Sequence, residues 1–244
     1  MENSAKFLNA FAAVEKLLRN IGGSDRRVPF YQMVDAAAMR SALVANKRDD
    51  LKEFADLRNA ITHERRGGEV IAEPHDRIVA ELQRLEDTLA NPPRVVPTFA
   101  KLVRTLDLEA PIDKVLSFFV PRNFSQVPVV SDGHLVGLLT TNTVSRWLAS
   151  HAKRQVVDVT EHKVSDALRQ TEHVGNWTLM SRTALLADVV SAFDTAESGG
   201  KRLDAVLITH AGKVTEARLG IVTIHDMPKV LRELTRPARK HLAA

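Results

Sequence analysis

The chain has 244 residues, of which 44% are hydrophobic and 26% are charged, a composition typical of a soluble globular protein. It contains no cysteine, which excludes a disulfide scaffold and any thiolate metal or redox site. Of the net charge of +4, residues 1–93 contribute −1 (14 Lys and Arg against 15 Asp and Glu), which leaves +5 for the remainder; this mild surplus suits a phosphate-bearing ligand better than a nucleic-acid-coating surface.

The first 90 residues predict a bundle of four helices. From Phe7 to Ile21, apolar residues recur at spacings of 4, 3, 4 and 3, which is the pattern of one apolar helical face. Further helices are predicted over residues 30–46 and 50–63, and a fourth begins near Pro74, since proline suits a first helical turn.

Residues 91–97 break the helical pattern, because three prolines in seven residues favour an extended connector. We place the domain boundary there. The predicted division is a helical bundle over 1–91, a linker over 92–98, two repeats over 99–158 and 159–236, and a basic tail over 237–244.

After the linker, a helix–strand–strand–helix order occurs twice, which indicates an internal repeat. Residues 137–148 align with residues 220–231, and residues 112–119 align with residues 186–193. The dipeptide Asp132-Gly133 predicts a tight two-residue hairpin between the strands of the first copy. The expected fold class is therefore α+β, with an all-α four-helix bundle followed by a two-repeat module.

The repeats resemble a known family. Pro128-Val129-Val130, Leu135-Val136-Gly137 and Thr140 in the first copy, with residues 220–226 in the second, are similar to the CBS (cystathionine β-synthase) motif. The resemblance covers roughly residues 98–236. It implies that two motifs fold into a disc with two clefts, and that the clefts hold adenosine ligands such as AMP, ATP, S-adenosylmethionine or a cyclic dinucleotide.

Thr223 and Asp226 are the candidate ligand-binding residues of the second copy. Thr223 is placed where a buried strand turns into a helix, so unpaired backbone N–H groups and its own hydroxyl could meet a phosphate. Asp226, one turn later, could accept both hydroxyls of a ribose, and the CBS resemblance implies these same two roles. Alternatively, Thr223 is a plain N-cap and Asp226 an acidic first-turn residue.

The first copy departs from this pattern, since Thr143 stands where the ribose carboxylate is expected. A hydroxyl cannot supply a charged, two-pronged acceptor. The cleft of Thr140, Asn142 and Thr143 is therefore expected to be empty, or to bind a different ligand with the help of the Asn142 amide. Four arginines are candidates to face ligand phosphates: Arg104, Arg122, Arg182 and Arg202.

The third predicted helix carries Arg58, Asn59 and His63. This trio resembles the motif of the HEPN superfamily, small helical bundles that include metal-independent endoribonucleases. The resemblance implies RNA cleavage in which His63 moves a proton and Arg58 stabilises charge on the phosphate, with Asn59 orienting one of them. Arg58 and His63 lie about 140° apart on one helix, a difficulty that a site shared across a dimer would remove.

The alternative is structural: His63 favours the C-terminal dipole of its helix, Arg58 pairs with Glu53 or Asp56, and Asn59 caps backbone groups. The leading hypothesis is an adenine-nucleotide sensor that controls a dimeric HEPN-like helical domain, for which metal-independent RNA cleavage is the candidate activity. Its rival is a non-catalytic adaptor that dimerises or docks a partner protein.

The expected ligand is AMP, ATP or a cyclic dinucleotide, with no metal required, and the expected partners are a second copy and RNA. No secretory signal follows Met1, and no run approaches the roughly 18–20 apolar residues of a membrane span. The expected location is therefore the cytoplasm.

Overall fold

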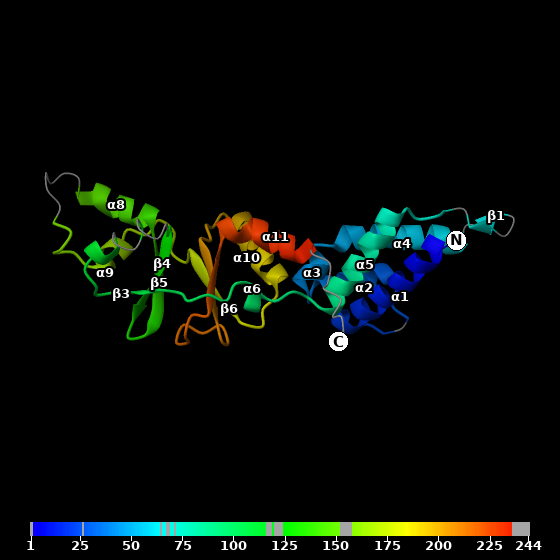
Figure 1. The fold of residues 1–244 in the computed structure, drawn as a ribbon, viewed down its shortest axis with the longest axis horizontal. Coiled ribbons are helices and arrows are strands. Elements are labelled where there is room, and N and C mark those ends of the chain that lie inside the picture. Colours follow the sequence, from blue (N-terminus) through cyan, green and yellow to red (C-terminus); the bar gives the residue numbers. More distant parts are fainter. Residues whose placement is uncertain are drawn as a thin grey trace, which may run out of the picture. The chain divides into compact units, whose positions relative to one another are not determined.

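The computed structural model describes residues 2–25, 27–63, 65–66, 69–70, 72–115, 119, 124–151 and 158–235. The chain divides into two compact units. The first comprises Met1–Pro93, Leu185–Ser191 and Pro228–Ala244, and the second comprises Arg94–Ala184 and Ala192–Met227. Figure 1 shows helices throughout the first unit and two small sheets in the second.

The first unit is built from α1 (Glu2–Gly22), α2 (Phe30–Ala38), α3 (Ala42–Ala45), α4 (Arg48–His63) and α5 (Asp76–Ala90). Helix α1 packs against α5, α2 and α4. Its predicted apolar face is buried, with Phe7, Val14 and Leu18 fully enclosed in the core. Ala187 of α10 and Leu234 of α11 also pack into this core.

The second predicted helix is broken. Residues 30–46 form α2 and α3, separated by a turn at Met39 and Arg40. Ser41, the N-cap of α3, has an extended backbone, and its hydroxyl accepts a hydrogen bond from Val44 N–H at 3.4 Å. Serine favours helix starts because its side chain satisfies a backbone donor that has no partner inside the helix. After α4, the short strands β1 (Arg65–Arg66) and β2 (Glu69–Val70) pair antiparallel. Gly67 and Gly68, between these strands in the sequence, lie outside the described residues.

The second unit contains two three-stranded sheets with the same plan. One has β3 (Leu106–Asp107), β4 (Gln126–Ser131) and β5 (His134–Thr140), and the other has β6 (Trp177–Ser181), β7 (Ala205–Thr209) and β8 (Gly220–Thr223). In each sheet the first two strands are parallel and the last two antiparallel.

The register of the sheets confirms the repeat. Gln126 pairs with Thr140 in the first sheet, and Ala205 pairs with Thr223 in the second. Three residues along, Val129 pairs with Gly137 and Ile208 pairs with Gly220. The α+β fold class is therefore confirmed, and the structure adds one strand, β3 or β6, ahead of the first helix in each copy.

Helices complete both copies: α6 (Val95–Thr98), α8 (Thr141–His151), α9 (Val164–Leu168), α10 (Leu186–Ser198), the 3₁₀ turn η1 (Ile224–Asp226) and α11 (Met227–Thr235). The predicted helix over 112–119 falls partly outside the described residues. The predicted hairpin turn is present, with positive φ at Asp132 (49°) and Gly133 (78°), as a tight turn with this twist requires.

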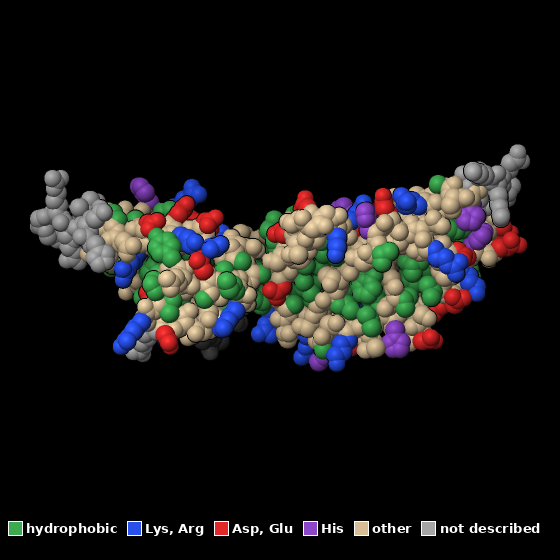
Figure 2. Space-filling model, turned by 180° about the vertical axis from the view of Figure 1, so that it is seen from behind, with side chains coloured by type: hydrophobic (Ala, Val, Ile, Leu, Met, Phe, Trp, Pro, Cys, Tyr) green, Lys and Arg blue, Asp and Glu red, His purple; other side chains and the backbone are tan. Residues whose placement is uncertain are grey.

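Within the described residues, no helix combines the length and the apolar character needed to cross a bilayer. On the face drawn in Figure 2, acidic and basic side chains are interspersed, and hydrophobic side chains reach the surface between them. Such a surface differs from the single-sign basic field that nucleic-acid-binding proteins present.

Candidate functional site

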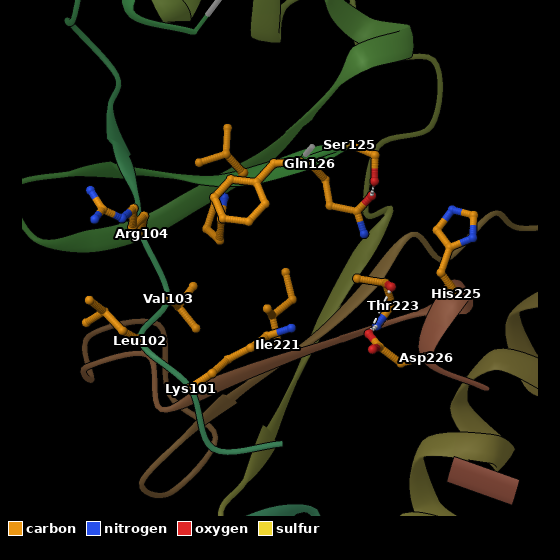
Figure 3. Close-up of a pocket in the computed structure, with 13 residues that line it drawn as sticks. Lys101, Leu102, Val103, Arg104, Ser125, Gln126, Ile221, Thr223, His225 and Asp226 are labelled. Carbon is orange, nitrogen blue, oxygen red and sulfur yellow. Dashed lines mark hydrogen bonds between the residues drawn. The ribbon is translucent and has the colours of Figure 1, made fainter. Parts of the chain in front are cut away.

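The larger cleft of the second unit has a volume of about 520 Å³ and is lined by three stretches of chain. These are residues 101–104 ahead of β3, residues 124–128 at the start of β4, and Ile221, Thr223, His225 and Asp226 of β8 and η1 (Figure 3). The lining therefore comes from both copies of the repeat.

Backbone pairing brings the segment ahead of β3 to this cleft. Ala100 forms an antiparallel bridge with Gly220, and Lys101 N–H donates to Leu219 O at 3.0 Å. The approach is close because residue 220 has no side chain: a Cβ there would lie 2.2 Å from Phe99 O. Gly220 thus allows residues of the first copy to line the cleft of the second.

Thr223 and Asp226 are joined at one side of the cleft. Thr223 N–H donates to Asp226 Oδ2 at 2.8 Å, and the Thr223 hydroxyl donates to the same oxygen at 3.0 Å (Figure 3). Among the described residues, no group donates to the second oxygen, Oδ1. One carboxylate oxygen therefore caps the turn, while the other can accept hydrogen bonds from a ligand.

The rest of the lining is apolar or basic. Val103, Phe124, Pro128 and Ile221 supply apolar surface, of the kind that accepts the face of a planar base. Lys101, which the sequence analysis did not single out, is exposed at the cleft, as is the expected Arg104.

The corresponding cleft of the first copy is almost filled, with a volume of about 10 Å³. Thr140 and Thr143 are buried with their hydroxyl oxygens 3.0 Å apart, and Thr143 N–H donates to Thr140 Oγ1 at 3.1 Å. Asn142, expected to offer its amide to a ligand, instead donates to Glu172 Oε2 at 2.9 Å.

A second set of hydrogen-bonded polar side chains fills the same cleft. Arg202 Nε donates to Asp204 Oδ1 at 2.7 Å, and Asn176 Nδ2 donates to Asp204 Oδ2 at 2.8 Å. The hydrogen bond and the negative charge of Asp204 raise the pKa of Arg202. The chain's own side chains thus satisfy the polar groups that a ligand of this cleft would need.

The four candidate arginines are now distinguishable. Arg104 lines the larger cleft, and Arg202 lines both the filled cleft and a neighbouring open hollow of about 430 Å³. Arg182 is exposed and belongs to the lining of neither, and Arg122 lies outside the described residues.

In the helical unit, α4 carries the predicted Arg58, Asn59 and His63. Arg58 Nη1 donates to Asn59 Oδ1 at 3.1 Å, and the Asp56 carboxylate is bonded to Tyr31. Arg58 thus bonds its neighbour rather than Glu53 or Asp56. The side chain of His63 lies outside the described residues, so its relation to Arg58 is untested. No cluster of three or more metal-ligating side chains occurs in the part of the chain that the structure describes.

Comparison with known proteins identifies part of this chain. Residues 100–150, which make up most of the first copy, match the CBS domain family. The C-terminal part therefore contains a CBS domain, and the register of the second sheet repeats it. No curated protein sequence matches the chain.

Solved structures of CBS proteins are similar at low identity. The CBS domain of a CBS domain-containing membrane protein from Sphaerobacter thermophilus is 18% identical over 63% of this chain and 98% of its own, with a TM-score of 0.46. A CBS domain-containing protein of unknown function from Kribbella flavida is 12% identical over 57% and 95%, with a TM-score of 0.43. CBSX2, solved in complex with AMP, is 15% identical over 59% and 99%, with a TM-score of 0.41.

Proposed function

We propose that the larger cleft binds an adenosine-type ligand and that the repeat pair acts as a sensor for it, regulating the helical unit. The observation that carries the proposal is the Asp226 carboxylate at the cleft, with Oδ2 held by Thr223 and Oδ1 without a donor among the described residues. A fixed carboxylate suits the neighbouring hydroxyls of a ribose, because charge-assisted hydrogen bonds are the stronger ones.

The choice of adenine and the sensing role rest on the CBS match of residues 100–150 and on the second copy of that unit. The cleft adds support through its volume of about 520 Å³, which lies in the usual range of small-molecule sites. Because the first cleft is closed by its own polar contacts, the proposal includes one ligand per chain.

Titration calorimetry with adenosine, AMP, ATP and a cyclic di-adenosine nucleotide tests this function. At least one is expected to bind with a stoichiometry of one per chain, and to stabilise the fold by about 2.7 kcal/mol when present at 100 times its dissociation constant. GMP and GTP serve as matched controls for the base. Equal binding of guanosine and adenosine nucleotides would contradict the choice of adenine, and two ligands per chain would contradict the closed cleft.

Two functions are candidates for the helical unit in a homodimer. It acts as an endoribonuclease, or it is a non-catalytic adaptor. The ribonuclease is the hypothesis that the Arg58, Asn59 and His63 trio raised. The mixed charges on the face drawn in Figure 2 and the net charge of −1 over residues 1–93 favour the adaptor, because RNA binding depends on a surplus of basic side chains.

The ribonuclease hypothesis makes a sharp prediction. The wild type should cut single-stranded RNA in excess EDTA and leave 2′,3′-cyclic phosphate ends, and His63→Ala should reduce cutting by about tenfold or more, since general acid–base groups contribute at least that much. His75→Ala is the matched control, because His75 is exposed at the start of α5. Absence of cutting by the wild type, with or without nucleotide, decides for the adaptor.

A further inference from the structure

Two cations of the larger cleft carry an inference beyond the presence of a nucleotide. Lys101 and Arg104 belong to the segment ahead of β3, which Lys101 N–H and Ala100 anchor to the neighbourhood of Gly220. In Figure 3 the Lys101 side chain runs beside Ile221 toward the Thr223–Asp226 pair, and Arg104 lies at the opposite end of the pocket.

Both cations are without an acidic partner in the part of the chain that the structure describes. Among the described residues, Lys101 and Arg104 take part in no ion pair and no side-chain hydrogen bond. Asp226 is the acidic residue of the lining, and it bonds Thr223 instead. The cleft therefore holds two unpaired positive charges and one carboxylate.

The filled cleft of the first copy shows the contrast. There Arg202 is paired with Asp204 at 2.7 Å, and Arg146, on the helix that starts at this cleft, lies 3.5 Å from Glu172. Among the described residues, Arg146 and Arg202 are thus paired with carboxylates, whereas Lys101 and Arg104, which line a volume of about 520 Å³, are not. These exposed cations are available to pair with an anionic group of a ligand.

We propose that Lys101 and Arg104 are the residues that select a phosphorylated ligand over the bare nucleoside. This inference rests on the proposed function, because it places the ribose at Asp226. A phosphate is repelled by that carboxylate, which directs it toward the Arg104 guanidinium at the other end of the pocket, and the Lys101 ammonium, which extends beside Ile221, adds attraction along the cleft. An ammonium binds phosphate as a point charge, and a guanidinium can bind it through two parallel hydrogen bonds.

The test measures the affinity gained by adding phosphates. Calorimetry with adenosine, AMP, ADP and ATP is performed in EDTA, so that no divalent ion masks the phosphate charge. AMP is expected to bind the wild type at least about tenfold more tightly than adenosine, the gain of a charged hydrogen bond. Lys101→Gln and Arg104→Gln should each lose a large part of the gain from phosphates, measured within each variant as the ratio of its AMP affinity to its adenosine affinity.

Arg182→Gln is the matched control, because it removes the same charge from an exposed position of this unit outside the cleft lining. It should keep the full gain. If all three variants lose the same share of the affinity gained from phosphates, the effect is one of overall charge and the inference is overturned. An unaltered gain from phosphates in Lys101→Gln and Arg104→Gln would overturn it as well. If adenosine binds and phosphates add nothing, the inference fails and the proposed function stands. If none of the four compounds binds, both fail.

Discussion

Replacing Gly220 with alanine is expected to lower the free energy of unfolding by about 3 kcal/mol, the upper end of the usual cost of overpacking. A Cβ at this position would lie 2.2 Å from Phe99 O and 3.1 Å from Ile208 Cδ1. Phe99 is 3% exposed and its N–H donates to Val95 O at 2.8 Å, so the blocking carbonyl belongs to a fixed backbone. Urea denaturation followed by circular dichroism measures the loss.

Gly137→Ala is the matched control, since Gly137 occupies the same place in the first sheet as Gly220 in the second. A Cβ at Gly137 would meet Leu168 Cδ2 at 2.8 Å, which is the end of a flexible side chain. The expected loss is about 1 kcal/mol, the lower end of the overpacking range. Equal losses in the two variants would contradict the close backbone approach at Gly220. Gly220→Ala should also weaken nucleotide binding, because it displaces the segment that carries Lys101.

The parts of this fold that local patterns encode were predictable from the sequence. The Asp132-Gly133 turn needs two residues that tolerate positive φ, and both adopt it. The alignment of residues 137–140 with residues 220–223 corresponds to the observed register of the two sheets. Strands β3 and β6 were missed, and β3 has two residues, too few to show an alternating pattern.

The candidate site was predictable only in part, because several of its contacts join residues far apart in the sequence. Thr223 and Asp226 follow from their spacing within the repeat. Lys101 reaches the cleft through the pairing of Ala100 with Gly220, which no local pattern reveals. The closure of the first cleft depends likewise on Glu172 and Asp204, whose partners lie on other segments. In the sequence, the one indication against ribose binding in that cleft was Thr143, which stands in place of the expected carboxylate.

Asp226→Ala is expected to weaken the binding of AMP or ATP by roughly 10- to 100-fold, because hydrogen bonds to a charged group contribute about 1.5–3 kcal/mol. The variant removes the ribose acceptor together with the cap on Thr223, so its melting temperature should also fall, as expected for a lost cap of about 1 kcal/mol.

A second aspartate separates these two effects. Asp188 Oδ2 accepts a hydrogen bond from Leu185 N–H at 2.8 Å in the first turn of α10, as Asp226 does from Thr223, and it is not part of the cleft lining. Asp188→Ala should therefore lose comparable stability and keep its full affinity in calorimetry. If Asp226→Ala also keeps its affinity, the carboxylate acts only as a cap, and a ribose does not bind at this place. A loss of affinity confined to Asp226→Ala assigns the free oxygen Oδ1 to the ligand, because both variants lose a cap and only this one loses an acceptor at the cleft.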